Sequence, residues 1–237
     1  MNMLNASTPS MFGLSHILYA VITIIAMIVS LILIKKFCKS KRSQNIAIII
    51  TASLLLSFII FNRISIATYS NDWLLLIPTS FCGMTSLLFS IATLIFLKNH
   101  NHSIFHFFAY IAFVGGILTT ITPTFIGQAS TIFHTRTISG LVHHSLAMYL
   151  AILILVLGRF KPSIKKIHCF WLGLTAYMTL GLFLIHAIGV DDAMYINNPA
   201  ATGIYWYMVG AIVLGIHFIG LGVYELCKKK FANSKSI

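Results

Sequence analysis

Charged residues are scarce in this sequence, and acidic ones are nearly absent. Only 8% of the 237 residues are charged, and Asp and Glu together number 4. A soluble domain of this size carries far more charge, about 25% of its residues, to cover its surface. No stretch of the chain is polar enough and long enough to form a soluble domain. The composition therefore argues against a soluble protein, and any active site must lie between helices or at a membrane surface.

Hydrophobic residues make up 58% of the chain. They occur in runs of about 20 residues, the length of helix that crosses a hydrocarbon core of roughly 30 Å. Seven such runs fill almost the whole sequence, which predicts an all-α fold: a polytopic bundle of seven transmembrane helices in a single domain over residues 1–237. The expected helices cover about residues 12–34, 45–68, 73–97, 104–121, 138–159, 167–190 and 205–227.

The formal net charge of +12 is high enough to suggest nucleic acid, but the placement of the basic residues argues against that partner. They gather in alternate segments between the apolar runs, as topology signals do. These segments contain Lys35, Lys36, Lys39, Lys41 and Arg42, then Lys98, then Arg159, Lys161, Lys165 and Lys166, and finally Lys228, Lys229 and Lys230. The positive-inside rule therefore predicts that the N-terminus is outside and the C-terminus is in the cytoplasm.

Polar and ionisable side chains inside a membrane are costly and are by default candidates for function. With this topology, most of them fall in the outer half of the bilayer. They are His16, Arg63, Cys82, His143, His144 and His186, with Arg136 in the outer loop before the fifth helix. At a rise of 1.5 Å per residue, Cys82 is about 14 Å deep from Trp73 and His144 is about 9 Å deep from Ile138. The third and fifth helices are thus expected to present a thiol and an imidazole at one level.

A cysteine paired with a histidine has a chemical interpretation. A thiol attacks an ester as the thiolate, and a nearby His accepts its proton. The thioester then passes its acyl chain to a second acceptor, while the Arg63 guanidinium suits a lipid phosphate. A structural interpretation competes with this one, since a membrane Cys is usually a small packing residue and a membrane His often hydrogen-bonds a neighbouring helix. From the residues alone, both interpretations stay open.

Two cofactor interpretations of the histidines are weaker. His100, His102 and His106 cluster at the start of the fourth expected helix, but no acidic residue or further Cys joins them in sequence. A protein metal site usually needs such additional ligands. His16 and His186 have matched depths for a haem between two helices, but no motif supports one. We therefore expect neither a metal nor a cofactor.

Six short segments carry a family resemblance. They are "FGLSHIL" with His16, "IPTSFC" ending at Cys82, "TTITP" ending at Pro123, "GLVHHSLAMYLAI" with His143 and His144, "GRFKPS", and "GVDDAMYINNPAATGIYWY". In this order and spacing they make the chain resemble the bacterial YwaF family of membrane proteins, which is similar to the eukaryotic transmembrane protein 164 acyltransferases. The resemblance runs over nearly the whole chain.

The resemblance implies an acyl transfer between glycerolipids, with a Cys nucleophile and a His partner. Cys82 matches the cysteine, and His144, which precedes a small residue and an apolar helix, matches the histidine better than its alternative, His143. The two histidines point about 100° apart on a helix, so only one is expected to face Cys82. The sequence departs from the family pattern just before the cysteine, where relatives carry a polar or His residue and this chain has Ser80 and Phe81.

Together these features predict a membrane lipid acyltransferase or acyl hydrolase that works through a thioester in the outer half of the bilayer. The expected site combines catalytic Cys82 and His144, or alternatively His143, with substrate-binding Arg63, His16, His186 and Arg136. A membrane phospholipid or lysolipid is the expected substrate, without a soluble partner, in a bacterial cytoplasmic membrane. Two alternatives stay open. A small transporter or permease component requires a pathway to the cytoplasmic side, and a structural membrane protein requires no turnover.

Overall fold

The structure is a computed structural model that describes residues 9–99, 102–198 and 205–233. Over these residues it is helical throughout, with seven α-helices, three short 3₁₀ segments (η1 to η3) and one π turn (η4). The α-helices are α1 (Leu14–Phe37), α2 (Lys41–Ser70), α3 (Phe81–Phe96), α4 (Phe105–Ile121), α5 (Thr135–Val156), α6 (Ile167–Phe183) and α7 (Trp206–Asn233). The short elements are η1 (Trp73–Leu76), η2 (Ile126–Gln128), η3 (Ile164–Lys166) and η4 (Leu184–Ile188). The predicted all-α fold is confirmed.

Four segments are long and apolar enough to cross a membrane. They are α1, α2, α5 and the stretch Ile164–Ile188, which contains α6. The helices α3 and α4, and the stretch Gly210–Leu226 within α7, are shorter but also apolar. The protein is therefore an integral membrane protein with several candidate spans.

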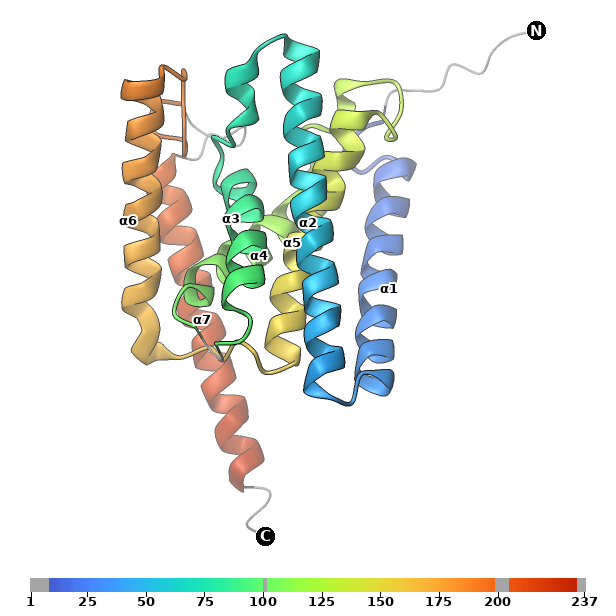
Figure 1. Cartoon of the computed structure of the whole chain (residues 1–237), viewed down its shortest axis with the longest axis vertical. Coiled ribbons are helices and arrows are strands. Elements are labelled where there is room, and N and C mark those ends of the chain that lie inside the picture. The colour runs from blue at the N-terminus through green and yellow to red at the C-terminus, as the bar shows by residue number, and fades with distance from the viewer. Residues whose placement is uncertain (1–8, 100–101, 199–204, 234–237) are drawn as a thin grey trace, which may run out of the picture.

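Consecutive helices run in alternating directions, so the chain connections fall at two ends of the bundle (Figure 1). One end, here called the basic end, holds the connections 35–42, 97–99 and 157–166 and the last turns of α7. These segments carry most of the Lys and Arg residues of the sequence. The opposite end, here called the distal end, holds the connections 71–80, 122–134 and 189–198. The alternation of basic and nonbasic segments in the sequence thus corresponds to two ends of the folded bundle.

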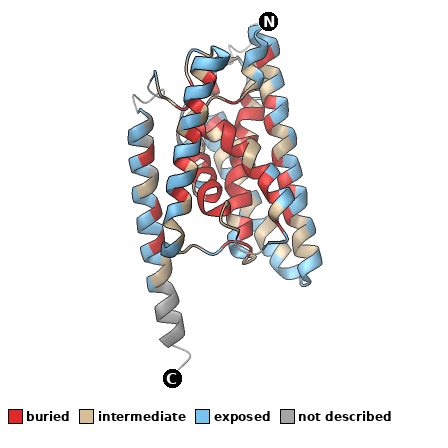
Figure 2. Cartoon of the chain, turned by 60° about the vertical axis from the view of Figure 1, so that its left-hand side comes forward, coloured by how far each residue is buried: buried red, intermediate tan, exposed pale blue. Residues whose placement is uncertain are grey.

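Buried residues concentrate in the central helices, whereas α1 and α7 expose most of their described side chains (Figure 2). Helix α5 packs against both α2 and α4. Gly116 permits the close approach of α4 to α5, because a Cβ atom at this position would lie 2.4 Å from Met148 Cβ. Small residues commonly allow such contacts between membrane helices. Towards the basic end, large apolar side chains with no exposed surface fill the core: Phe89, Phe105, Leu150, Leu153 and Ile154.

The third helix begins later than the predicted range 73–97. Trp73–Leu76 forms η1, the chain is extended at Ile77, and α3 starts only at Phe81. Pro78 explains the interruption, because proline lacks an N–H group and disfavours helical geometry in the preceding residue. Ser80 then caps α3 by accepting a hydrogen bond from the Gly83 N–H group at 3.1 Å. Cys82 consequently lies in the first turn of α3 rather than deep within a helix.

Local sequence features also set other helix ends. Helix α2 begins before the predicted residue 45 because the Ser40 hydroxyl caps it, accepting from the Ser43 N–H group at 3.1 Å. Side-chain caps of this kind satisfy a backbone donor that a helix start leaves free. After α6, η4 ends at Gly189, whose φ of 82° is readily adopted only by glycine. The boundaries of the other helices differ from prediction by a few residues, and α7 continues to Asn233.

Candidate functional site

A polar cavity of about 190 Å³ lies at the distal end, between α2, α3, α5 and the loop that contains η2. Its wall consists of Asn62, Arg63 and Ile66 of α2, Ser80 and Gly83 at the start of α3, Phe125 and Gln128 of the loop, and Arg136, Gly140, His143 and His144 of α5. Four residues selected from the sequence therefore meet here: two arginines and two histidines. No carboxylate is among the lining residues, so the cavity is suited to an anionic group.

Arg63 connects the cavity wall to η1. Its Nε and Nη2 atoms donate hydrogen bonds to the Leu75 carbonyl oxygen at 2.8 and 2.6 Å. A guanidinium group has five N–H donors. The other three make no hydrogen bond to the described residues, so Arg63 retains donors for a ligand in the cavity.

Arg136 supplies a second guanidinium at the start of α5. Its Cζ atom lies 4.8 Å from the centre of the Tyr69 ring, a cation–π contact. Its Nε atom is buried and has no hydrogen-bond partner among the described residues. Asn62 fixes the backbone of this turn, donating to the Arg136 carbonyl oxygen at 3.3 Å and to Ser139 Oγ at 3.0 Å. A buried donor without a partner is costly, which favours an acceptor group beside Arg136.

His143 is held by a serine of α3. The side chain of His143 is buried, and its Nδ1 atom lies 3.1 Å from the Ser86 hydroxyl. Ser86 is itself buried, so water does not compete for this hydrogen bond. A hydrogen bond to one ring nitrogen sets the tautomer and orientation of an imidazole. With Nδ1 engaged by Ser86, Nε2 is the nitrogen of His143 that is left for chemistry.

His144 lines the same cavity, although it points in another direction from α5. Its ring stacks on Phe125, with ring centres 6.2 Å apart, and lies 4.2 Å from the His143 ring. Gly140 makes room for Phe125, because a Cβ atom there would lie 2.8 Å from the phenylalanine ring. The loop after α4 thus folds over α5 and brings both imidazoles to one cavity wall, although they are adjacent in sequence.

Cys82 lies beside the cavity without lining it. Its thiol is free and partly buried, and its Sγ atom would be 2.7 Å from a Cβ atom at Gly115. The thiol therefore faces α4 at a position where only glycine fits. No hydrogen bond joins Cys82 to either histidine within the described residues. Ser86, one helical turn further along α3, lies on the same face as Cys82 and holds His143, so one face of α3 carries both the thiol and the serine that holds the imidazole.

A strained loop lies against the start of α3. The Met194 N–H group donates to the Thr79 carbonyl oxygen at 2.7 Å, and the ring of Phe81 packs against the Tyr195 ring at 6.0 Å. Met194 and Tyr195 have φ angles of 54° and 56°, in the left-handed region that residues other than glycine rarely adopt. Burial raises the pKa of the Tyr195 phenol, and the nearby Cys82 raises it further. Tyr195 is thus a neutral hydrogen-bond donor next to the thiol.

Two other residues selected from the sequence do not line the cavity. The His16 side chain is buried between α1 and α4, where Nδ1 accepts from the Phe12 N–H group at 2.9 Å and Nε2 donates to the Thr120 carbonyl oxygen at 2.8 Å. His186 lies in η4, and its side chain is exposed. Neither is among the residues that line the cavity.

The histidines near the basic end are placed against aromatic rings. His102 stacks on Phe96 with ring centres 4.3 Å apart, and His106 packs on Phe160 at 4.9 Å. His100 lies outside the described residues. Across the described ranges, no group of three His, Cys, Asp or Glu side chains is arranged to hold a metal ion.

Sequence reasoning missed several residues of this region, including Ser86, Asn62, Phe125 and Tyr195. Serine and asparagine are common in membrane helices as packing residues, so neither stands out in a single sequence. Ser86 had one usable signal, its spacing of four residues from Cys82 on a helix. Phe125 and Tyr195 lie in loops, whose folded paths the helical pattern does not reveal.

The apolar helical bundle and its polar distal cavity define an integral membrane protein with a polar candidate site at one end of the bundle. The chain belongs to the TMEM164 family, whose family model matches residues 11–223. The matched range contains Cys82, Ser86 and every residue that lines the cavity. No curated protein and no solved structure matches the chain. The resemblance to the transmembrane protein 164 family that the sequence segments indicated is thereby confirmed.

Proposed function

We propose that this protein is a membrane lipid acyltransferase or acyl hydrolase that uses Cys82 as nucleophile and a histidine of the polar cavity as proton acceptor. The observation that carries the proposal is the arrangement around Ser86. This serine binds His143 at 3.1 Å and lies one helical turn from Cys82. Membership of the TMEM164 family supports a membrane function for the cavity.

The proposed reaction has two steps. In the first, the cavity histidine takes the thiol proton and Cys82 Sγ attacks an ester carbonyl carbon of a glycerolipid. The ester C–O bond breaks, the histidine returns the proton to the departing alcohol oxygen, and a thioester and a lysolipid result. In the second, the hydroxyl of another lysolipid or of water attacks the thioester, giving a new ester or a fatty acid and restoring the thiol.

The start of α3 favours this chemistry. Cys82 lies in the first helical turn, where backbone N–H groups and the helix dipole favour negative charge on a nearby group. Tyr195, which lies close to the thiol and remains protonated, offers a donor for the oxyanion that forms on the attacked carbonyl. The strained backbone of Met194 and Tyr195 is consistent with a loop that is held in place for function.

The two arginines are the proposed site for the phosphate of the lipid. Arg63 has guanidinium donors that no described residue uses, and Arg136 has a buried Nε atom without a partner. Arginine matches phosphate geometry because its planar group donates two parallel hydrogen bonds. A phosphate between Arg63 and Arg136 would set the distance between the lipid headgroup and the ester that Cys82 attacks.

Transport is less well supported by the packing. A transporter needs a continuous polar pathway between the two ends of the bundle. Between the cavity and the basic end, the core consists mainly of fully buried apolar side chains such as Phe89, Leu150 and Leu153, with the buried hydroxyl groups of Ser90 and Thr93 alongside them. The polar cavity therefore suits a reaction at one membrane surface better than passage across the membrane.

The proposal includes an orientation. We assign the basic end to the cytoplasm by the positive-inside rule, which puts the polar cavity in the outer leaflet. The membrane that we propose is the bacterial cytoplasmic membrane, following the resemblance to the bacterial YwaF family. The acyl donor and acceptor are then phospholipids or lysolipids of that leaflet.

The test is lipid turnover by the purified full-length protein. The protein is reconstituted with a phospholipid labelled in one acyl chain and an unlabelled lysolipid, and labelled products are separated over time. Cys82→Ala is expected to abolish turnover, and loss of the histidine that acts as base should lower it by about 10²–10⁴-fold. His143→Ala and His144→Ala are compared to identify that residue. Cys169→Ala, near the start of α6, is the matched control and should retain full activity.

Turnover that persists unchanged in Cys82→Ala would contradict the assigned nucleophile. A second contrary result would combine two observations. The unsubstituted protein would show no lipid turnover, and the same substitutions would only lower the melting temperature. That result would favour a structural role for the polar cluster.

A further inference from the structure

Two apolar chambers lie along the seam between α4 and α5, on the basic-end side of the polar cavity. The upper chamber, of about 320 Å³, is partly open, borders α1 and is lined by residues that include Ile24, Ile28, Ile117 and Met148. The lower chamber, of about 360 Å³, is also partly open, borders α7 and is lined by residues that include Ala109, Ala151, Leu155 and Val223. Their walls are almost wholly apolar, apart from Thr120 in the upper chamber and two tyrosines in the lower one.

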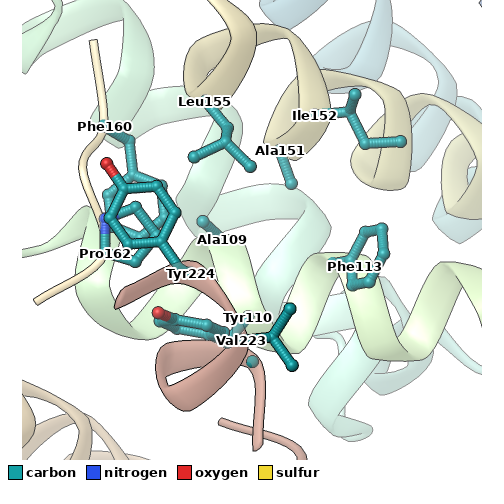
Figure 3. A pocket seen from close by; sticks show the side chains of 11 residues that line it. Ala109, Tyr110, Phe113, Ala151, Ile152, Leu155, Phe160, Pro162, Val223 and Tyr224 are labelled. Carbon is teal, nitrogen blue, oxygen red and sulfur yellow. The ribbon is translucent and has the colours of Figure 1, made fainter. Parts of the chain in front are cut away.

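The chambers meet at a shared pair of side chains. Phe113 of α4 and Ile152 of α5 line both of them. Figure 3 shows these two residues at one end of the lower chamber, while the hydroxyl groups of Tyr110 and Tyr224 point towards the other end, near Phe160 and Pro162. The two chambers are therefore adjacent at Phe113 and Ile152, and the polar tip of the lower one is remote from this joint.

Helix α5 connects this apolar seam to the polar cavity. His144 lines the cavity, Met148 one turn later lines the upper chamber, and Ile152 and Leu155 line the lower one. At 1.5 Å per residue, the stripe from His144 to Leu155 is about 16 Å long. A leaflet of a bilayer with a hydrocarbon core of roughly 30 Å is about 15 Å thick, so its acyl chains have the same reach.

We infer that the two chambers form a binding track for one acyl chain of a membrane glycerolipid, with the ester near His144 and the methyl end near Leu155. The inference rests on the proposed function, because the polar cavity supplies the headgroup end of the same ligand. Hydrocarbon is the chemistry that matches walls of Ile, Met, Phe and Ala, and the surrounding bilayer supplies it. The joint at Phe113 and Ile152 then lies beside the middle of the chain.

Photolabelling in vesicles tests the track. The full-length protein is reconstituted with trace phosphatidylglycerol that carries a diazirine near the methyl end of one chain, and labelled peptides are mapped by mass spectrometry. Labels are expected on the lower chamber, at Ala151 and Leu155. Ile152→Trp should lower labelling there by about tenfold or more, because filling a packed apolar space disfavours its occupant. Leu172→Trp, at an exposed position on α6, is the matched control and should leave labelling of the chamber unchanged.

Two comparisons keep the result decisive. If Ile152→Trp does not fold, Ala109→Leu fills the lower chamber from α4 and should produce the same loss. Labels scattered over exposed positions such as Leu172, with no response to either substitution, would overturn the inference. The same labelling in Cys82→Ala is expected to be unchanged. If the chamber is labelled but the purified protein shows no lipid turnover that depends on Cys82, the result counts against the proposed reaction and not against the track.

Discussion

Ser86 joins the two parts of the candidate site at the scale of single residues. Its hydroxyl binds His143, and it follows Cys82 by one turn of α3. His144 has a different environment, stacked on Phe125. The two imidazoles thus differ in what fixes them: a buried hydrogen bond orients His143, whereas an aromatic contact orients His144. A hydrogen bond defines the position of a ring nitrogen more narrowly than stacking does, so the ring of His143 is held in a more narrowly defined position than that of His144.

Ser86→Ala is expected to impair both stability and turnover. It leaves the buried Nδ1 atom of His143 without a partner, which costs about 1–3 kcal/mol. The melting temperature in detergent should fall, and the pH profile of lipid turnover should shift as His143 loses its fixed tautomer. Ser90→Ala is the matched control, since the Ser90 hydroxyl is also buried but donates within α3, to the Leu87 carbonyl oxygen at 2.7 Å. A pH profile identical in both variants would show that Ser86 does not act through His143.

At this scale the sequence predicted the ionisable residues better than their partners. Arg63, Arg136, His143 and His144 line one cavity, as their shared depth suggested. These four were visible in sequence because charged and imidazole groups are rare in membrane helices, whereas Cys82, His16 and His186, selected for the same reason, do not line the cavity. The partners of these groups are serine, asparagine, phenylalanine and backbone carbonyls, which occur throughout the chain. Their roles depend on which helix faces which, and hydropathy does not contain that information.

At the scale of elements, α1 differs from the central helices in how it is attached. His16 is its only buried residue. Three hydrogen bonds connect it to the bundle: His16 to the Thr120 carbonyl oxygen at 2.8 Å, Tyr19 to Ser145 at 2.7 Å, and Ser30 to Tyr149 at 2.5 Å. Polar contacts therefore fix the register of α1, and its apolar side chains face the lipid and the upper chamber.

His16→Ala should loosen the start of α1. It removes the hydrogen bonds to Thr120 and to the Phe12 N–H group, so hydrogen exchange in the first turns of α1 should accelerate while exchange in α5 stays unchanged. Leu18→Ala, at a half-exposed position two residues later, serves as the control. If His16→Ala leaves exchange in α1 unaltered but abolishes turnover, His16 belongs to the substrate site, as the sequence had suggested.

The helices themselves were largely predictable, and their interruptions were less so. The length and hydropathy of the apolar runs located all seven α-helices, because each helix carries apolar side chains along most of its length, packed in the bundle or exposed on its outside. The split before α3 was not predicted, although Pro78 is its visible cause. The apolar run from Trp73 to Leu97 hides the break, since η1 contributes apolar residues without continuing the helix. This break determines the depth of Cys82 and therefore its relation to the cavity.

At the scale of the whole molecule, the distribution of basic residues distinguishes the two ends of the bundle. The basic connections share one end of the bundle and the polar cavity lies at the other. Hydropathy and charge could predict this separation of ends because both depend on distance along the membrane normal. They could not predict the lateral order of the helices, which placed α5 between α2 and α4. That order depends on side-chain fit, such as the contact of Gly116 with Met148.

The proposed orientation is testable with single cysteines in a background where the native cysteines are replaced by serine. Phe133→Cys lies in an exposed loop at the distal end, and Lys165→Cys lies in η3 at the basic end. A thiol reagent that does not cross membranes should label Phe133→Cys in intact cells. It should label Lys165→Cys only after the cells are permeabilised. The opposite pattern would reverse the assigned orientation and move the polar cavity to the cytoplasmic leaflet.

The most direct test of the central claim is to trap the thioester. The purified protein is mixed with a phospholipid that has a labelled acyl chain, quenched within one turnover, and analysed by mass spectrometry. We expect one acyl chain on Cys82, removable by hydroxylamine and absent in Cys82→Ala. An acyl chain that accumulates on Cys38 or Cys169 instead, or a protein that turns lipid over with no acyl group on Cys82, would contradict the proposed mechanism.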